Sequence, residues 1–311
     1  MNTEPEVIVD VVDGVGRLTL NRPRAINALT LGMIRTLQAA LDAWRDDAGV
    51  TAVELRGAGE RGLCSGADVR AIRQVVLDGG DHLEFFREEY VLDGSIATYP
   101  KPYTAWLEGI TMGGGLGLSA HASRRIVTPA SRLAMPETII GFTPDVGILH
   151  HLTRAPGELG THLALTGTAV GAADALLVGL ADECCGEAGP GVLEGARSWI
   201  DPCYDSDDPA DVVGRLETHP DPDARVAALD LRARSPLSVA VTLEAVRRAG
   251  AMTSVAEVLA QDLVLARHLA GGPDFVEGVR AQLVDKDRSP RWQHDRIEDV
   301  TRDEVLACFQ R

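Results

Sequence analysis

The stretch Gly109-Ile110-Thr111-Met112-Gly113-Gly114-Gly115 joins a strand-like segment at residues 102–107 to an apolar helix predicted from Leu116. Consecutive glycines at such a junction let the backbone approach a ligand closely and present N–H groups to it. A second junction, Cys64-Ser65-Gly66-Ala67-Asp68, follows a strand predicted over residues 51–56. Two N–H groups aimed at one point form an oxyanion hole. Taken alone, however, glycines at a strand–helix junction more often serve close packing than ligand binding.

The segments around these junctions alternate between strands and helices. Alternating apolar and polar residues predict a β-hairpin over residues 7–20 with Asp13-Gly14 at its turn. Apolar residues at helical spacing predict a helix capped by Thr30. Further patterns predict helices over 69–77 and 83–96, a strand over 125–128 and helices from His150 onward. This alternation indicates α/β architecture.

The composition changes after about residue 200. Residues 201–223 are rich in Asp and Pro, which predicts a surface connection. Residues 236–268 then show long helical periodicity. We therefore predict a core over residues 1–200 and a mainly helical C-terminal region over residues 201–311.

The charge of the chain limits its partners. Its 311 residues carry a net charge of −16, and Lys101 and Lys286 are the only lysines. An acidic surface disfavours nucleic acid and anionic membranes, so any phosphate site must be built locally from arginines and N–H groups. No apolar run approaches the ~20 residues of a membrane span. The acidic first ten residues do not resemble a secretory or transit signal, so a cytoplasmic location is expected.

The cysteines do not form a recognisable framework. There are five of them, an odd number, and no pair of C-x-x-C motifs is present. This spacing predicts free thiols rather than disulfides or a zinc site.

A third motif, taken together with the two junctions, points to one protein family. It is Ala134-Met135-Pro136-Glu137-Thr138, followed by Pro144-Asp145-Val146-Gly147. With it, the chain resembles the crotonase superfamily, also called the enoyl-CoA hydratase/isomerase family. The motifs that match in order and spacing are Asn21-Arg22-Pro23, Asn27-Ala28-Leu29, Ser65-Gly66-Ala67-Asp68, Gly113-Gly114-Gly115 and Pro136-Glu137.

The resemblance implies a fold and a chemistry. The fold would be a crotonase-type ββα spiral core, with the helical C-terminal region added to it. The N–H groups of Ala67 and Gly114 would hold the carbonyl of an acyl-coenzyme A thioester. No metal or redox cofactor is implied, because coenzyme A enters as part of the substrate. Crotonase-like proteins often assemble as trimers or hexamers, so a homo-oligomer is a further expectation.

One position separates branches of this family. Hydratases of the family carry a glutamate two positions after the triple glycine, where this chain has Gly117. Glycine has no group that holds a proton or water, so the two-glutamate hydration mechanism is not available in its usual form. Asp145 instead lies eight residues after Glu137. We expect the loop between them to turn both carboxylates toward one cavity.

Other segments resemble the 3-hydroxyisobutyryl-CoA hydrolase branch, and the likeness extends over residues 7–309. They are residues 85–90, residues 109–112 with the glycines that follow, and residues 275–280 continuing to 285–292. The implied activity is hydrolysis of a short hydroxyacyl-CoA to free acid and coenzyme A, as in valine catabolism. By this resemblance the substrate and catalytic positions are Glu89, Gly114, Glu137 and Asp145.

The implied roles leave alternatives open. Glu137 either attacks the thioester carbonyl or activates a water. Asp145 assists proton transfer or holds the substrate hydroxyl, which Glu89 orients. The three carboxylates also have simpler interpretations: a helix-start residue for Glu137, a turn residue for Asp145 and a solvated helix face for Glu89. Glu88, which precedes Glu89, is predicted to lie on such a solvated helix face.

Arginines near the N-terminus are candidates for the coenzyme A phosphates. Guanidinium pairs with phosphate through two parallel hydrogen bonds, and Arg22 and Arg24 flank the Pro23 of the first motif. An ordinary surface role is the alternative. Three other functions also remain: enoyl-CoA hydration or isomerisation of another acyl-CoA, RNA binding, and a catalytically silent assembly role. The net charge of −16 counts against RNA binding.

Overall fold

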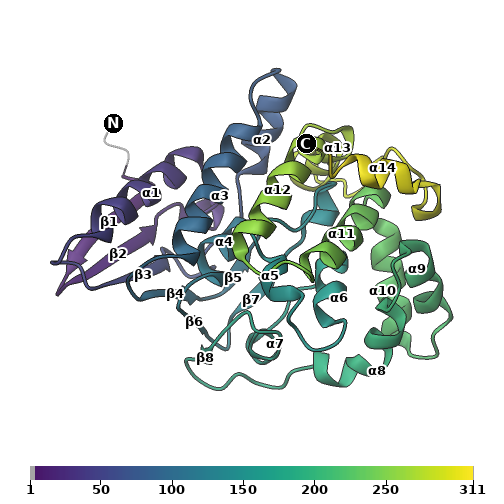
Figure 1. Cartoon of the computed structure of the whole chain (residues 1–311), viewed down its shortest axis with the longest axis horizontal. Coiled ribbons are helices and arrows are strands. Elements are labelled where there is room, and N and C mark those ends of the chain that lie inside the picture. Colours follow the sequence, from purple (N-terminus) through teal and green to yellow (C-terminus); the bar gives the residue numbers. More distant parts are fainter. Residues whose placement is uncertain (1–3, 311) are drawn as a thin grey trace. The chain divides into compact units, whose positions relative to one another are not determined.

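The computed structural model describes residues 4–310, which form two compact units interleaved along the chain (Figure 1). Unit 1 comprises the described residues up to Asp68, with Arg87–Ala134 and Val170–Gly191. Unit 2 comprises Val69–Phe86, Met135–Ala169 and the described residues from Val192 onward. The division at residue 200 remains a prediction from sequence.

Unit 1 is built on a mainly parallel sheet. Its six strands run in the order β1-β2-β3-β4-β6-β8, and only β1 and β2 pair antiparallel. A second sheet pairs β5 with β7 in parallel. This confirms the predicted α/β class. The strands are β1 (Val7–Val12), β2 (Val15–Leu20), β3 (Ala52–Gly57), β4 (Tyr103–Leu107), β5 (Ile110–Met112), β6 (Arg124–Val127), β7 (Arg132–Ala134) and β8 (Glu183–Cys184).

The predicted hairpin and first helix are confirmed. Strands β1 and β2 pair across Asp13-Gly14. Helix α1 (Leu31–Arg45) begins after Thr30, whose side chain accepts the Met33 N–H at 3.1 Å. Gly16 on β2 is required by packing, because a Cβ there would lie 2.6 Å from the Trp44 ring. The helix therefore packs directly on the sheet.

The other helical elements of unit 1 are short, apart from α3. Helix α4 begins at Gly114, two residues before the start predicted from sequence, because the glycines themselves adopt the helical conformation. Residues of α3 are divided between the two units. These elements are η1 (Pro23–Ala25), α3 (Leu83–Ala97), α4 (Gly114–Ala120) and α7 (Ala172–Leu177).

The regular elements of unit 2, among its described residues, are all helices. The periodicity predicted over 236–268 is confirmed, but it belongs to two helices, because Ser254 and Glu257 form a capping box that starts the second. Its elements are α2 (Val69–Leu77), η2 (Glu137–Ile140), α5 (Leu149–Leu152), α6 (Leu159–Thr166), α8 (Leu193–Tyr204), α9 (Pro209–Thr218), α10 (Pro222–Ala233), α11 (Pro236–Ala249), α12 (Val255–Leu269), α13 (Pro273–Val279), η3 (Arg280–Val284), η4 (Ile297–Asp299) and α14 (Arg302–Ala307).

The surface connection predicted over residues 201–223 is wrong. The segment holds the end of α8, all of α9 and the start of α10. Asp208 and Asp221 each accept a backbone N–H of the following helix at 2.9 Å, and each precedes a proline at the first helical position. These Asp-Pro pairs therefore start helices, for which aspartate at the cap and proline next are both favoured.

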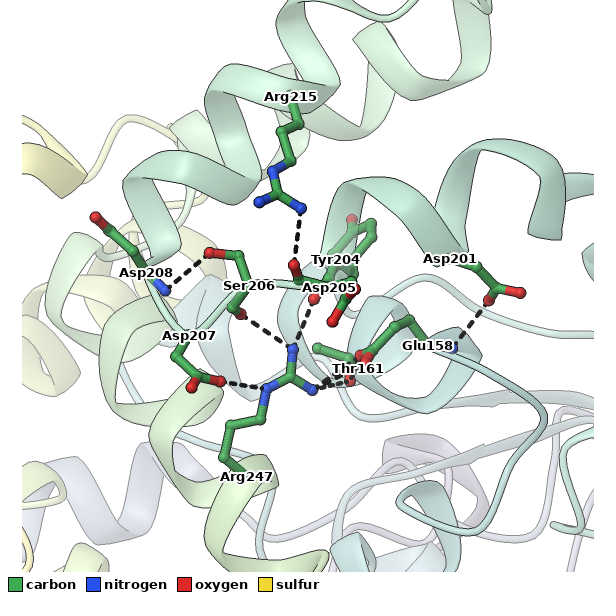
Figure 2. A network of polar contacts seen from close by, with 10 residues as sticks. All are labelled: Glu158, Thr161, Asp201, Tyr204, Asp205, Ser206, Asp207, Asp208, Arg215 and Arg247. Atoms are coloured by element: carbon green, nitrogen blue, oxygen red, sulfur yellow. Dashed lines mark hydrogen bonds and ion pairs between the residues drawn. The ribbon is translucent and has the colours of Figure 1, made fainter.

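Arg247 on α11 holds the connection between α8 and α9 (Figure 2). Its Nη1 donates to both oxygens of Glu158, at 3.2 and 2.9 Å, and its Nε donates to Asp207 at 3.0 Å. Its Nη2 donates to the carbonyls of Tyr204 and Ser206, at 2.6 and 3.0 Å. One guanidinium thus joins two segments of unit 2 that are distant in sequence, Glu158 and residues 204–207.

Replacing Arg247 with methionine is expected to lower the free energy of unfolding by about 2–3 kcal/mol, because a partly buried carboxylate and two carbonyls lose their donors. Urea unfolding followed by circular dichroism measures this loss. Asp207→Asn is the matched control, since the Asp207 side chain is 88% exposed and such an ion pair contributes about 0–1 kcal/mol. Equal unfolding midpoints for Arg247→Met and the unmodified protein would contradict this assignment.

Candidate active site

The two glycine junctions of unit 1 lie against each other. The segments at Cys64 and Thr111 form a parallel bridge, in which Met112 donates its N–H to the Cys64 carbonyl at 2.9 Å. A Cβ placed on Gly66 would lie 3.6 Å from the Gly114 nitrogen. The backbone at Ala67 and the start of α4 are therefore neighbours, as the sequence predicted.

The N–H groups of Ala67 and Gly114 are available to a ligand. Within residues 4–310, neither donates a hydrogen bond to a protein acceptor. For Gly114 this follows from its place in the first turn of α4, where N–H groups have no partner within the helix. Gly113, which precedes it, has φ +50° and ψ −125°, a conformation that only glycine adopts readily. This arrangement suits an oxyanion hole, and that role remains a prediction.

Glu89 is buried beside Gly114. Only 1% of Glu89 is exposed, and a Cβ built on Gly114 would lie 2.3 Å from its Oε1. Its neighbour Glu88 behaves differently and forms an ion pair with Arg35 at 2.6 Å on the outer side of α3. A solvated helix face, considered as an alternative, therefore describes Glu88 and not Glu89.

Cys64 lies in the same region but is not a nucleophile. Burial, with a smaller contribution from the charge of Glu89, raises the pKa of the thiol to about 12. A thiol with this pKa is protonated at neutral pH, and the reactive form of cysteine is the thiolate. Carboxylates are thus the candidates for the nucleophile or base.

Glu137 is the first residue of η2 in unit 2, and its side chain is buried. Burial raises the pKa of Glu137 well above its usual range, and the negative charge of Asp145 raises it further. Its Oε2 has no hydrogen-bond partner among the described residues. Glu137 is a helix-start residue, which was the alternative interpretation, but no side-chain hydrogen bond caps the N-terminus of η2. A buried carboxylate in this state is typical of acid–base or nucleophilic groups.

Two glycine contacts fix the position of η2. Gly141 ends η2 with φ +73°, and a Cβ there would lie 2.4 Å from the backbone of Asp274. A Cβ on Gly278 would lie 2.5 Å from the backbone of Ile140. Gly278 belongs to the C-terminal segment whose sequence resembles the hydrolase branch, and Asp274 immediately precedes that segment. That segment therefore packs on the turn that carries Glu137.

Asp145 is also buried, with 5% exposed. Its carbonyl accepts the Ile148 N–H at 3.0 Å, so the residue does lie in a turn. Its electrostatic effect on Glu137 shows that the two carboxylates are near each other in unit 2. That the intervening loop turns both carboxylates toward one cavity stays a prediction.

Sequence analysis missed a third carboxylate, Asp262 on α12. It is fully buried, and its Oδ2 accepts the Gly147 N–H at 2.8 Å. Burial raises the pKa of Asp262 well above its usual range, and the charge of Asp145 adds to this. The sequence did contain a signal, because Asp262 falls on the buried side of α12, whose apolar members are Val258, Leu259, Leu265, Ala266 and Leu269. An aspartate on an apolar stripe needs a specific partner.

The two arginines of the first motif differ. Arg22 is engaged by Glu6 at 3.1 Å, by Asp68 at 3.2 Å and by the Ala28 carbonyl. Arg24 lies exposed in η1 with no ion pair among the described residues. Binding of coenzyme A phosphate by either arginine remains a prediction. Arg22 would have to give up its ion pairs with Glu6 and Asp68 to bind a phosphate. No group of His, Cys, Asp and Glu in the described part of the chain has the arrangement of a metal site.

Comparison with known proteins extends over nearly the whole chain. The family model described as enoyl-CoA hydratase/isomerase matches residues 15–194 and 186–309. A protein of Danio rerio named 3-hydroxyisobutyryl-CoA hydrolase, mitochondrial, is 36% identical over 98% of this chain and 89% of its own length. The human protein of that name is 32% identical over 98% and 88%.

Solved structures give the same fold. One from Mycobacterium thermoresistibile, described as a carnitinyl-CoA dehydratase, has a TM-score of 0.95 and 43% identity, covering 98% of this chain and 96% of its own. One from Rhodobacter sphaeroides, described as an enoyl-CoA hydratase, also has a TM-score of 0.95, with 37% identity and coverage of 98% and 97%.

Proposed function

Because the chain belongs to the enoyl-CoA hydratase/isomerase family, we propose that it hydrolyses the thioester of a short hydroxyacyl-coenzyme A, of the 3-hydroxyisobutyryl-CoA kind, to the free acid and coenzyme A. The observation that carries the proposal is the distribution of carboxylates. Position 117 holds a glycine, buried in α4, while Glu137 and Asp145 are buried and electrostatically coupled. The vertebrate relatives named as hydrolases support it.

The chemistry assigns one task to each group. The Ala67 and Gly114 N–H groups polarise the thioester carbonyl and stabilise the oxyanion that forms on its oxygen. Glu137 attacks the carbonyl carbon to give an acyl-enzyme anhydride that water then hydrolyses, or it takes a proton from the attacking water. The C–S bond breaks, and the coenzyme A thiolate leaves and takes up a proton. Asp145 assists proton transfer or holds the substrate hydroxyl, which Glu89 orients.

A second candidate is addition or removal of water at an enoyl-CoA. The two solved structures described as a dehydratase and a hydratase favour it. Gly117 counts against it, because the position offers no carboxylate to orient water. Relatives of similar identity thus carry names from both classes, and the glycine at position 117 is the reason to favour hydrolysis.

The test is a paired assay on one preparation. With 3-hydroxyisobutyryl-CoA or 3-hydroxypropionyl-CoA, we expect release of free coenzyme A thiol. With crotonyl-CoA, we expect little or no loss of the enoyl absorbance. The five free cysteines give a thiol background, so an enzyme-only control is required. Rapid hydration of crotonyl-CoA without thiol release from either hydroxyacyl substrate would replace the hydrolase assignment by the second candidate.

The setting of the reaction is also proposed. A role in valine catabolism follows from the substrate. A cytoplasmic location is part of this proposal, whereas the vertebrate relatives are named as mitochondrial. No helix among the described residues has the length and hydrophobicity needed to cross a bilayer. A trimer or hexamer is the expected assembly, which sedimentation velocity measures directly.

A further inference from the structure

Asp262 lies outside the residues to which the reaction assigns a task, yet it binds the loop that carries one of them. We propose that Asp262 is a positioning residue, which fixes Asp145 by holding the N–H of Gly147. This rests on the proposed function, because the role of Asp145 in hydrolysis comes from there. Asp262 and Gly147 are 115 residues apart in sequence, and their hydrogen bond is buried.

The loop after Asp145 needs such a contact. Val146 has φ +54° and Gly147 has φ +74°, so two consecutive residues adopt the left-handed conformation. A β-branched residue such as valine adopts it only where the surroundings impose it. Val146 is completely buried. Without Asp262, the Gly147 N–H would be a buried donor with no acceptor, and the loop would be driven toward another conformation.

A second anchor holds the other side of the loop. The Thr242 hydroxyl on α11 donates to the Thr143 hydroxyl at 3.0 Å, and both side chains are fully buried. Thr143 and Gly147 each lie two residues from Asp145, one before it and one after it. Asp145 is therefore held between contacts from two helices.

The placement of Asp262 is otherwise unfavourable. It occupies a position on the buried stripe of α12, where an apolar side chain would pack without cost. Its Oδ1 is buried and has no hydrogen-bond partner among the described residues. No cation pairs with the carboxylate there, and nearby Asp145 makes its negative charge costlier still. The Gly147 contact is the interaction in the structure that accounts for a carboxyl group at this position.

The test compares two replacements at position 262 with a neighbouring control. Asp262→Asn keeps an oxygen that accepts the Gly147 N–H, whereas Asp262→Ala removes it. Gln261→Met is the control, because Gln261 is a buried polar neighbour whose Nε2 donates to the Ala245 carbonyl at 3.3 Å and not to the loop. We measure kcat and KM for thiol release, and hydrogen–deuterium exchange of the peptide that contains Gly147.

The expected pattern is specific to positioning. Asp262→Ala lowers kcat by roughly 10²-fold, the scale of a displacement of about 1 Å in a catalytic group, with KM little changed. The Gly147 peptide exchanges faster in this variant, while Asp262→Asn and Gln261→Met stay close to the unmodified protein in both measurements. If Asp262→Ala does not fold, Asp262→Ser carries the same expectation, since its shorter hydroxyl does not reach Gly147.

Two results would overturn the proposal. One is an unchanged kcat and exchange rate in Asp262→Ala. The other is a loss in Asp262→Asn as large as that in Asp262→Ala, which would show that the charge matters and not the hydrogen bond. If the unmodified protein releases no thiol from any hydroxyacyl-CoA, the proposed function fails. The exchange measurement then still tests the contact itself.

Discussion

Replacing Glu137 with glutamine is expected to lower turnover in thiol release by at least ~10²-fold, the usual scale for a positioned base or nucleophile. Glutamine keeps the size of the side chain and removes its capacity to attack or to take a proton. Because Glu137 is buried, a nearly isosteric change is the replacement that best preserves the packing around it. Steady-state kinetics on the purified variant measure the loss.

The raised pKa of Glu137 adds a dependence on pH. The carboxylate must be ionised to act, so the rate should rise with pH through a pKa above the usual glutamate range. Stability should move the other way. From the usual carboxyl pKa up to the raised one, the folded state holds a proton that the unfolded state has lost, so the free energy of unfolding falls as pH rises. The difference in melting temperature between Glu137→Gln and the unmodified protein should therefore become more positive with pH across this window.

The matched control for Glu137 is Glu88→Gln. Glu88 pairs with Arg35 outside the candidate site, and pairing with this arginine lowers the pKa of Glu88. The control should keep its turnover. Near-normal turnover in Glu137→Gln would remove Glu137 from the mechanism, whatever the stability measurements show.

Local sequence patterns predicted much of the fold, because caps, turns and strand alternation are determined by residues close together in the sequence. The Thr30 cap, the turn at Asp13-Gly14 and the alternation in the strands each depend on a few adjacent residues. The matching motifs then predicted the crotonase-type fold, which the structures at a TM-score of 0.95 confirm. Glu89 was assigned to the substrate site from the resemblance alone, since its charged helix gave no local sign that the side chain is buried.

What sequence analysis missed depends on contacts between distant segments. Asp-Pro pairs are typical of both turns and helix starts, and only the packing of α9 and α10 decides between them at Asp208 and Asp221. The role of Asp262 follows from a hydrogen bond to Gly147 that spans most of unit 2 in sequence. A polar residue on an apolar stripe is a usable signal for such a contact, but it does not identify the partner.

Replacing Gly114 with alanine is expected to lower turnover by about 10²–10³-fold, the scale for losing one oxyanion-hole donor. The reason is steric. A Cβ on Gly114 would lie 2.3 Å from Oε1 of Glu89 and 3.0 Å from Cδ1 of Leu29. Glu89 is buried and cannot move into solvent without opening the packing around it. The start of α4 must shift instead. The Gly114 N–H would then no longer be directed, together with the Ala67 N–H, at the proposed position of the thioester oxygen.

Gly214→Ala separates this effect from the general consequences of adding a methyl group to a helical glycine. A Cβ on Gly214 meets nothing within 4 Å, so the replacement in α9 should stabilise the protein by about 0.5–1 kcal/mol and leave turnover unchanged. Circular dichroism and thermal unfolding of Gly114→Ala show whether the variant remains folded. The loss should fall on kcat more than on KM, because an oxyanion hole binds the charge that develops in the transition state more strongly than the ground-state carbonyl. A folded Gly114→Ala variant that keeps a tenth or more of its turnover would mean that the thioester carbonyl is held elsewhere.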